Sequence, residues 1–247
     1  MGIAKALSLS NFRATLARLS TQARLARRVK DILDYIFDWS HGTRTAGIVP
    51  LEQLHIESRR KDLGVFYAPV PGYEFRKLIR YLKIRPEKYT FIDFGCGKGR
   101  ALLYAINHGF RRVVGIEFSE ALSKIAVENV AKYRRGAAEV IFGDAADFVI
   151  PDEPCVLYFA NPFSEVVTQE ILSGVYDAYR SGNHDIYIIW YNTTPNTRPL
   201  LEAAWLKLVA GESTVTPYLR EGRTLLQMAE FSLPFSIFRV SHDPPPD

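Results

Sequence analysis

The chain has 247 residues, of which 47% are hydrophobic and 23% are charged, and its formal net charge is +4. This composition is typical of a globular protein and excludes a disordered or collagen-like chain, and no apolar run approaches the roughly 18–20 residues that a membrane-spanning helix needs. Only two cysteines, Cys96 and Cys155, and five scattered histidines are present, so we expect neither a disulfide scaffold nor a metal site.

The N-terminal arm, residues 1–30, contains seven basic residues and no acidic residue, whereas the rest of the chain has 24 basic and 27 acidic residues. The positive charge is therefore concentrated in the arm. Apolar residues recur at spacings of three and four from Phe12 to Phe37, which predicts an amphipathic helix. We expect this helix to lie on the domain with its basic face in water, to contact nucleic acid or an acidic protein partner, or to act as a mitochondrial presequence.

Glycine and proline residues punctuate residues 39–72, which predicts a connector made of turns. The apolar pattern then alternates between helices and strands. Helices are predicted over residues 73–84, 99–107, 120–135, 164–179 and 198–206, and strands over 90–94, 112–116, 139–142, 155–160, 185–191 and near 206–219, 223–232 and 235–240. Ser119 and Gly136 are predicted to cap the third of these helices.

The central strands are almost continuously apolar, with the sequences FIDF, VVGI, VLYFA and IYIIWY. Such strands are expected where helices cover both faces of a parallel sheet. We therefore predict an α/β fold with a doubly wound sheet, in one domain over residues 64–242. Residues 1–63 are expected to form a basic helical extension and connector, and residues 243–247 a disordered tail.

The first strand ends in FIDFGCGKGR, so that Asp93 is followed by Gly95, Gly97 and Gly99. Glycines here let the backbone turn sharply and approach a ligand closely, and the next helix begins with free N–H groups. The spacing GxGxG differs from the GxGxxG of dinucleotide-binding turns. Because Asp93 would repel a pyrophosphate and attract an ammonium or sulfonium group, the loop favours S-adenosylmethionine over NAD. A purely structural turn is the alternative.

Acidic residues also follow the second and third strands. Glu117 stands 24 positions after Asp93. At the end of the second strand, a carboxylate can accept hydrogen bonds from both hydroxyls of a ribose. In the segment FGDA, Asp144 and Ala145 are expected to bind the amino group and a ring nitrogen of adenine, and Phe118 or Phe142 to pack on the ring. The alternatives are a solvated carboxylate for Glu117 and a turn residue for Asp144.

The fourth strand leads into Asn161, Pro162 and Phe163. The Asn161 carboxamide oxygen and a carbonyl freed by the proline turn can accept hydrogen bonds from an attacking amine, and Phe163 can stack on the substrate. Strand four is expected beside the glycine loop, so we predict that these residues are catalytic and that Asn161 also contacts the cofactor. The alternative is a strand-to-helix turn with Pro162 near the helix start.

In this order, DFGCGKGR, GIEFS, FGDA and ANPF resemble motifs I to IV of class I S-adenosylmethionine-dependent methyltransferases. The resemblance covers residues 64–240, and GTRTAG, GVFYAPVPGYEF and IIWYN are similar to a bacterial group of such proteins. It implies a seven-stranded sheet of order 3-2-1-4-5-7-6 with the last strand antiparallel. It also implies that Asp93 and the Gly95–Gly99 loop, Cys96 included, hold the methionine part of the cofactor, Glu117 the ribose and Asp144 the adenine.

Two narrower resemblances concern the methyl acceptor. NPF is similar to the NPP[FY] motif of amino-group N-methyltransferases but lacks the second proline. FYAPVPGYEF is similar to a loop that closes over the cofactor in lysine methyltransferases of this fold, which implies that Tyr67 and Tyr73 are lid residues and that Tyr67 helps to orient the acceptor nitrogen. An ordinary ordered loop is the alternative for this segment.

We therefore expect a cytoplasmic S-adenosylmethionine-dependent methyltransferase that acts on a nitrogen nucleophile by in-line displacement. A protein side chain such as lysine is the favoured acceptor, ahead of RNA, DNA or a small molecule. A non-catalytic module that binds the same cofactor is the alternative from another functional class.

Overall fold

The computed structural model describes residues 28–50, 67–133, 136–160, 163–182, 185–192, 198–212, 216–217, 231–232 and 234–240. Most of the predicted arm, residues 51–66 of the connector and the predicted tail lie outside these residues. Within the described part of the chain, no helix is long and apolar enough to cross a membrane.

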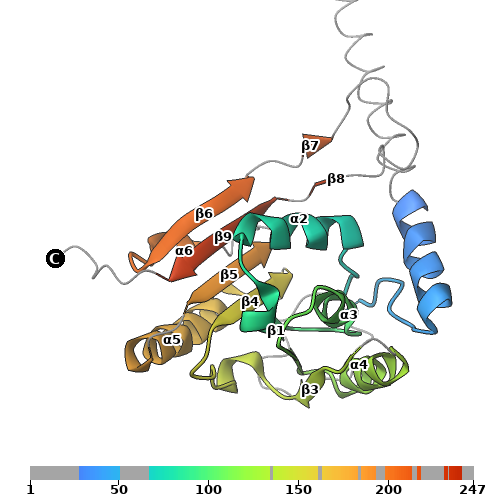
Figure 1. Cartoon of the computed structure of the whole chain (residues 1–247), viewed down its shortest axis with the longest axis horizontal. Helices are drawn as coiled ribbons and strands as arrows, with labels where there is room; N and C mark the ends of the chain where they lie inside the picture. The colour runs from blue at the N-terminus through green and yellow to red at the C-terminus, as the bar shows by residue number, and fades with distance from the viewer. Residues whose placement is uncertain are drawn as a thin grey trace, which may run out of the picture.

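A seven-stranded sheet forms the centre of the molecule (Figure 1). Its strands are β1 (Thr90–Phe94), β2 (Arg112–Glu117), β3 (Glu139–Phe142), β4 (Cys155–Ala160), β5 (Ile186–Tyr191), β6 (Leu206–Glu212) and β9 (Phe235–Val240). They lie in the order β3-β2-β1-β4-β5-β9-β6, and β9 is antiparallel to both of its neighbours. Since β9 is the seventh strand of this sheet along the chain, the predicted order 3-2-1-4-5-7-6 with an antiparallel last strand is confirmed. The short strands β7 (Thr216–Pro217) and β8 (Phe231–Ser232) pair separately.

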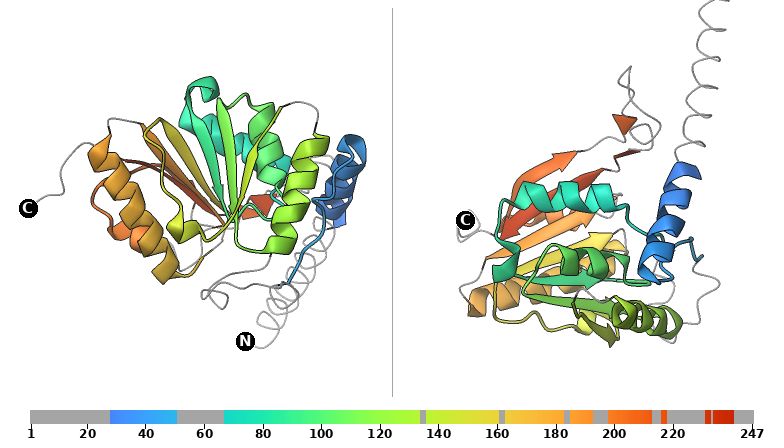
Figure 2. Two further views of the ribbon diagram at one scale, coloured as in Figure 1. Left: turned by 90° about the horizontal axis from the view of Figure 1, so that it is seen from below. Right: turned by 45° about the vertical axis from the view of Figure 1, so that its right-hand side comes forward.

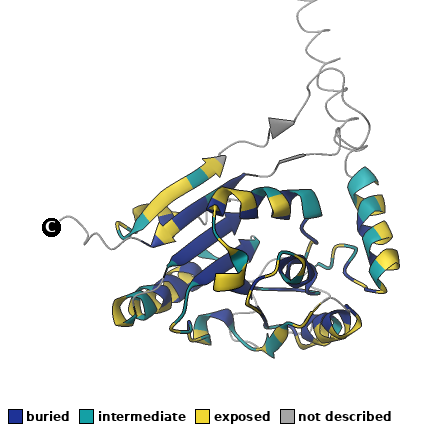
Figure 3. Ribbon diagram, in the orientation of Figure 1, coloured by how far each residue is buried: buried dark blue, intermediate teal, exposed yellow. Residues whose placement is uncertain are grey.

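Helices cover both faces of the sheet (Figure 2). The helices are α2 (Gly72–Leu82), α3 (Arg100–Asn107), α4 (Glu120–Lys132), α5 (Glu165–Ser181) and α6 (Arg198–Glu202), with 3-10 turns η3 (Pro86–Lys88) and η4 (Ala145–Asp147). Side chains of α2, α3 and α4 pack on one face of the sheet, and those of α5, α6 and η4 pack on the other. All residues of β1 and β5 are therefore buried, which explains the unbroken apolar sequence of β5 and the mostly apolar sequence of β1 (Figure 3).

Two helix ends differ from the prediction. Helix α4 takes Tyr133 as its C-cap, so the prediction that Gly136 caps it is wrong, whereas Ser119 caps its start as predicted. Tyr133 leaves the helix in an extended conformation, and its buried ring lies 5.3 Å from the ring of His41. This packing ends the helix before the glycine is reached. Helix α6 is shorter than predicted because Leu206 already pairs within the sheet.

Residues 28–41 form a helix, here called the N-terminal helix, which packs beside α3 (Figure 1). The Phe37 ring meets the Tyr104 ring of α3 edge-on, with 5.3 Å between the ring centroids. Asp34 and Asp38 point to the same side and are buried. Four large apolar residues at helical spacing are exposed on the outer side: Ile32, Tyr35, Ile36 and Trp39.

Candidate functional site

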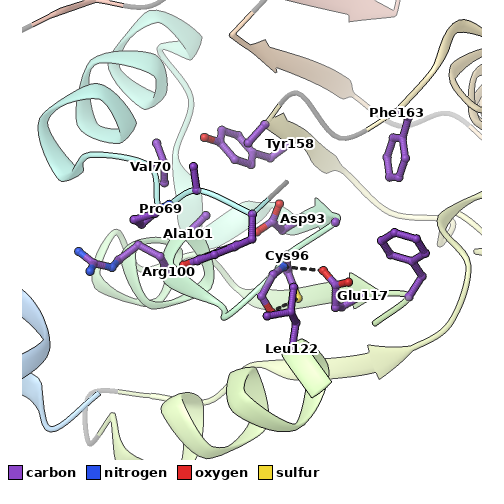
Figure 4. Close-up of a pocket in the computed structure, with 16 residues that line it drawn as sticks. Pro69, Val70, Asp93, Cys96, Arg100, Ala101, Glu117, Leu122, Tyr158 and Phe163 are labelled. Atoms are coloured by element: carbon purple, nitrogen blue, oxygen red, sulfur yellow. Dashed lines mark hydrogen bonds between the residues drawn. The ribbon is translucent and has the colours of Figure 1, made fainter. Parts of the chain in front are cut away.

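A pocket opens at the carboxyl ends of β1, β2 and β4, the edge of a parallel sheet where ligands are expected. Figure 4 shows its lining, with Arg100 and Phe163 at opposite ends. The lining residues are Tyr67, Ala68, Pro69, Val70, Asp93, Gly95, Cys96, Gly97, Arg100, Ala101, Glu117, Phe118, Leu122, Tyr158, Ala160 and Phe163.

The glycine loop after β1 forms the floor of the pocket. Gly95, Gly97 and Gly99 have φ angles of 80°, 55° and 84°, in the left-handed region that favours glycine. The backbone N–H groups of Gly95 and Cys96 both donate to the carbonyl of Ile116, at 2.9 Å. These bonds tie the loop to the neighbouring strand β2, so the turn is fixed relative to the acidic end of that strand.

Tyr67 covers the loop at Gly97. A Cβ atom at position 97 would lie 2.1 Å from Cδ2 of the Tyr67 ring, so a side chain there cannot be accommodated without moving the tyrosine. The Tyr67 hydroxyl donates to the carbonyl of Thr45 at 2.6 Å. Its burial raises the pKa of Tyr67 well above the ordinary value, so the phenol keeps its proton.

Glu117 lies at the end of β2 and is almost fully buried. Its Oε2 accepts a hydrogen bond from the Gly97 N–H at 2.7 Å, and its Oε1 accepts one from the Ser119 N–H at 2.8 Å. Burial raises the pKa of Glu117 to about 7, although backbone N–H groups, including these two, oppose the shift. The carboxyl group is therefore held beside the glycine loop and titrates near neutral pH.

Asp93 lies one residue before the end of the neighbouring strand β1 and also lines the pocket. Its side chain is buried, and no group among the described residues donates a hydrogen bond to its carboxylate. Burial, with a further contribution from the Glu117 charge, raises the pKa of Asp93 well above its usual value. A buried carboxyl group without a donor favours a ligand that brings positive charge or hydrogen-bond donors.

The end of β3 lies close by but outside the lining. Gly143 N–H donates to the Glu117 carbonyl at 3.0 Å, which brings the two strand ends together. Oδ1 of Asp144 accepts a hydrogen bond from Ala146 N–H at 3.0 Å and caps η4, in which Ala145 is buried. Neither Asp144 nor Ala145 lines the pocket, so their role in adenine binding stays a prediction.

Besides Tyr67, the predicted aromatic residues Phe118 and Phe163 reach the pocket. Phe163 follows the end of β4, and its ring centroid lies 6.4 Å from that of Phe159 in an edge-on arrangement. Phe142 is more than half exposed and does not line the pocket. Asn161 and Pro162 lie outside the described residues, so the structure leaves their predicted roles untested.

Sequence reasoning missed Tyr158 and Arg100. Tyr158 pairs with Asp93 in the parallel register of β1 and β4, so the two side chains share a face of the sheet. The alternation along β4 could have indicated this. Arg100 directly follows Gly99 and begins α3. Its side chain points away from Glu117 (Figure 4) and contacts acidic residues of the N-terminal helix, which no local sequence pattern indicates.

The arrangement fits a cationic nucleoside better than a pyrophosphate. Two buried carboxyl groups, Asp93 and Glu117, flank a loop that lacks a side chain at Gly97. Ionised carboxylates would repel phosphate groups, whereas they attract an ammonium or sulfonium and accept hydrogen bonds from hydroxyls. Phe118 and Leu122 add apolar surface for a ring. That these residues hold S-adenosylmethionine stays a prediction.

Comparison with known proteins agrees with this chemistry. A family model described as a methyltransferase domain matches residues 91–182. PH1948 of Pyrococcus horikoshii, named as a proposed RNA methyltransferase, is 18% identical, with a TM-score of 0.50, and the match covers 77% of this chain and 94% of that one. The magnesium protoporphyrin IX methyltransferase of Synechocystis PCC 6803, solved with bound S-adenosylmethionine, is 12% identical, with a TM-score of 0.48. The match covers 69% of this chain and 80% of that one. No curated protein matches the chain.

The matched region begins in β1 and ends just after α5, so it includes the glycine loop, Glu117 and the end of β4. The likeness to PH1948 supports the fold over a larger part of the chain. Residues 91–182 therefore match a methyltransferase domain, and the described sheet and helices have the fold of the class I, Rossmann-like methyltransferases.

Proposed function

We propose that the enzyme transfers a methyl group from S-adenosylmethionine to a nitrogen nucleophile, with a protein side chain such as lysine as the favoured acceptor. The observation that carries the cofactor assignment is the pair of buried carboxyl groups of Asp93 and Glu117 beside Gly97. The acceptor assignment is supported by Phe163 in the pocket wall and by the sequence Asn161-Pro162 directly before it.

Each carboxyl group has a distinct proposed role. Glu117 would accept hydrogen bonds from the ribose hydroxyls, and Asp93, which has no donor of its own, would face the charged methionine part. Phe118 and Leu122 would pack against the adenine, with Asp144 and Ala145 at its polar edge. The glycine loop would let the backbone approach the methionine part closely, because Gly97 has no side chain.

When bound, S-adenosylmethionine supplies a methyl group on a positively charged sulfur, which is electrophilic without covalent help from the protein. The protein must align the acceptor nitrogen with the carbon–sulfur bond and exclude water. In the proposed arrangement, the Asn161 carboxamide oxygen accepts a hydrogen bond from the acceptor N–H, and Phe163 shields one side. A lysine acceptor must first lose a proton to solvent, and the aromatic surroundings favour its neutral form.

The composition also bears on where the enzyme acts. Its two cysteines are both unpaired in the structure, which is compatible with the reducing cytoplasm that we propose as its compartment. The basic arm offers a contact for an acidic partner, and RNA is the second acceptor class because the arm carries seven positive charges.

The test is transfer of a tritiated methyl group into a lysate from cells that lack this gene, after isothermal titration has established cofactor binding. Label that protease removes and nuclease spares supports the proposal. Label in RNA, DNA or a small molecule reassigns the acceptor. Cofactor binding without label in any fraction supports the non-catalytic module. Asn161→Ala is the paired variant: it is expected to slow transfer at least tenfold and to weaken cofactor binding much less, because its main proposed role is toward the acceptor.

A further inference from the structure

A segment that precedes the matched methyltransferase domain is hydrogen-bonded to the glycine loop. Residues 43–49, here called the strap, follow the N-terminal helix, and Asp38 of that helix organises them. Its Oδ1 accepts hydrogen bonds from the Thr43 and Thr45 hydroxyls at 2.8 and 2.7 Å, and its Oδ2 accepts one from the Ala46 N–H at 2.6 Å. One buried carboxylate therefore binds three residues of the strap.

Arg100 joins this cluster from the other side. It is the first residue of α3, and its side chain is only 2% exposed. The guanidinium lies 3.3 Å from Oδ1 of Asp34 and 3.5 Å from Oδ1 of Asp38, and it also donates to the Thr45 hydroxyl and stacks on the Phe37 ring at 4.2 Å. Because a buried arginine needs such partners, the N-terminal helix and strap are bound to the residue that follows Gly99.

The strap also contacts the glycine loop directly. The Lys98 ammonium donates to the Ala46 carbonyl at 2.8 Å. The Arg44 N–H donates to Oδ1 of Asn129 at 2.8 Å, while the Asn129 amide donates to the Lys98 carbonyl at 2.9 Å. Asn129 is fully buried, so this bridge between strap and loop is protected from water.

Tyr67 connects the strap to the pocket. Its hydroxyl donates to the Thr45 carbonyl, and its backbone exchanges two hydrogen bonds with Val49, at 3.0 and 2.9 Å. Its ring lies on Gly97, whose N–H donates to Glu117. The chain of contacts therefore runs without a gap from Asp38 through the strap to the residues that line the pocket.

We propose that Asp38 and Arg100 are positioning residues for the cofactor: through Thr45 they hold the Tyr67 ring against Gly97 and thereby shape the wall that receives the methionine part. This inference rests on the proposed function, because it requires the cofactor to occupy this pocket. It extends the cofactor site to residues 34–49, which lie outside the matched domain.

The first measurement compares the cofactor affinity of Asp38→Asn with that of the full-length wild type, by titration with S-adenosylhomocysteine well below the melting temperature. We expect Asp38→Asn to weaken binding at least tenfold. Asp31→Asn is the matched control, because it makes the same substitution on the same helix at an exposed position outside residues 34–49. Asp31→Asn should stay within twofold of the wild type. A lower melting temperature of Asp38→Asn with unchanged affinity would mean a purely structural role and would overturn the inference.

The second measurement tests the route through Tyr67. Tyr67→Phe removes the hydroxyl bond to the strap and keeps the ring. If Asp38 acts through this ring, the double variant Asp38→Asn/Tyr67→Phe should bind no more than twofold more weakly than Asp38→Asn alone. If the double variant loses affinity by the product of the two single-variant factors, the two residues act independently and the route through Tyr67 is wrong. If Asp38→Asn does not fold, Thr45→Val takes its place in both measurements, since it removes the hydroxyl shared by Asp38 and Arg100.

Different binding results would contradict the proposed function and the role of Asp38. A wild-type protein that does not bind S-adenosylhomocysteine or S-adenosylmethionine refutes the proposed function and the inference together. Wild-type binding with equal binding by Asp38→Asn, Thr45→Val and Tyr67→Phe refutes the inference alone and leaves the proposed function standing.

Discussion

Asp93 and Glu117 lie at or next to the ends of neighbouring parallel strands, and both carboxyl groups are buried close to the same loop. Burial raises both pKa values, that of Glu117 to about 7. In the unfolded chain a glutamate titrates near 4.5, so the proton on Glu117 stabilises the free fold at low pH, and this contribution is lost as pH rises through about 7. A ligand that donates hydrogen bonds or carries positive charge favours the ionised forms, so cofactor binding and proton release are coupled at these residues.

We expect the affinity for S-adenosylhomocysteine to rise as pH increases from 5.5 to 7.5, because the carboxyl groups must ionise when the ligand binds. Titration calorimetry in two buffers with different ionisation enthalpies would count the released protons. Glu117→Gln should weaken binding at pH 7.5 by roughly 1–3 kcal/mol through lost charge-assisted hydrogen bonds, and should flatten the pH dependence. An affinity that does not change with pH, together with no proton release, would remove Glu117 from the ribose site.

Gly97 offers a test of the close approach between the loop and Tyr67. Gly97→Ala places a methyl group 2.1 Å from the Tyr67 ring, at a φ of 55°. The strain at positive φ alone costs about 1–2 kcal/mol of stability. Gly109→Ala measures this cost without a steric clash, because Gly109 has a φ of 75° and open space around it. We expect urea unfolding to show a larger loss of stability for Gly97→Ala, and cofactor titration to show at least tenfold weaker binding for this variant only. Equal behaviour of the two variants would contradict the packing of Tyr67 on the loop.

At the scale of elements, the N-terminal helix is joined to α3 by an ionic cluster rather than by apolar packing alone. Arg100 faces two acidic residues of that helix, Asp34 and Asp38. For Asp38, burial opposes the charge, but hydrogen bonds from Thr45, Ala46 and Thr43 outweigh it and lower the pKa. For Asp34, burial prevails and the pKa is raised. Arg100 is therefore the cation that these two acidic residues share.

Removing that arginine should be costly. Arg100→Met leaves two buried carboxyl groups without their guanidinium partner, so we expect a loss of about 3–5 kcal/mol in the free energy of unfolding. Arg198→Met removes an exposed ion pair with Glu202 and should cost less than about 1 kcal/mol. Urea denaturation of the two variants at pH 7 gives the comparison. A small loss for Arg100→Met would show that apolar contacts such as Phe37 on Tyr104 are sufficient to hold the helix.

At the scale of the whole molecule, the pocket combines three parts of the chain: the strand ends, residues 67–70 before α2, and the strap behind them. A ligand that binds the folded pocket stabilises every part that must be in place for binding. The strap and the glycine loop should therefore respond to the cofactor together, although they are about 50 residues apart in the sequence.

Hydrogen exchange can detect this response. We expect S-adenosylhomocysteine to slow exchange of the Arg44 and Ala46 amides as well as that of the Gly97 amide, all of which donate hydrogen bonds within this network. The amides of β6, at the far edge of the sheet, should change little. Slowing confined to the glycine loop would show that the strap is not part of the cofactor site.

The sequence by itself determined the order of helices and strands and the acidic and glycine-rich strand ends, because these depend on local apolar periodicity and turn chemistry. Since parallel strands place their carboxyl ends at one edge, Asp93, the glycine loop and Glu117 were predictable as neighbours. The contacts of Arg100 with Asp34 and Thr45 and the position of Tyr67 over Gly97 join residues 30 to 66 positions apart. No local pattern encodes such contacts, so only the docking of the N-terminal helix in the tertiary structure decided them.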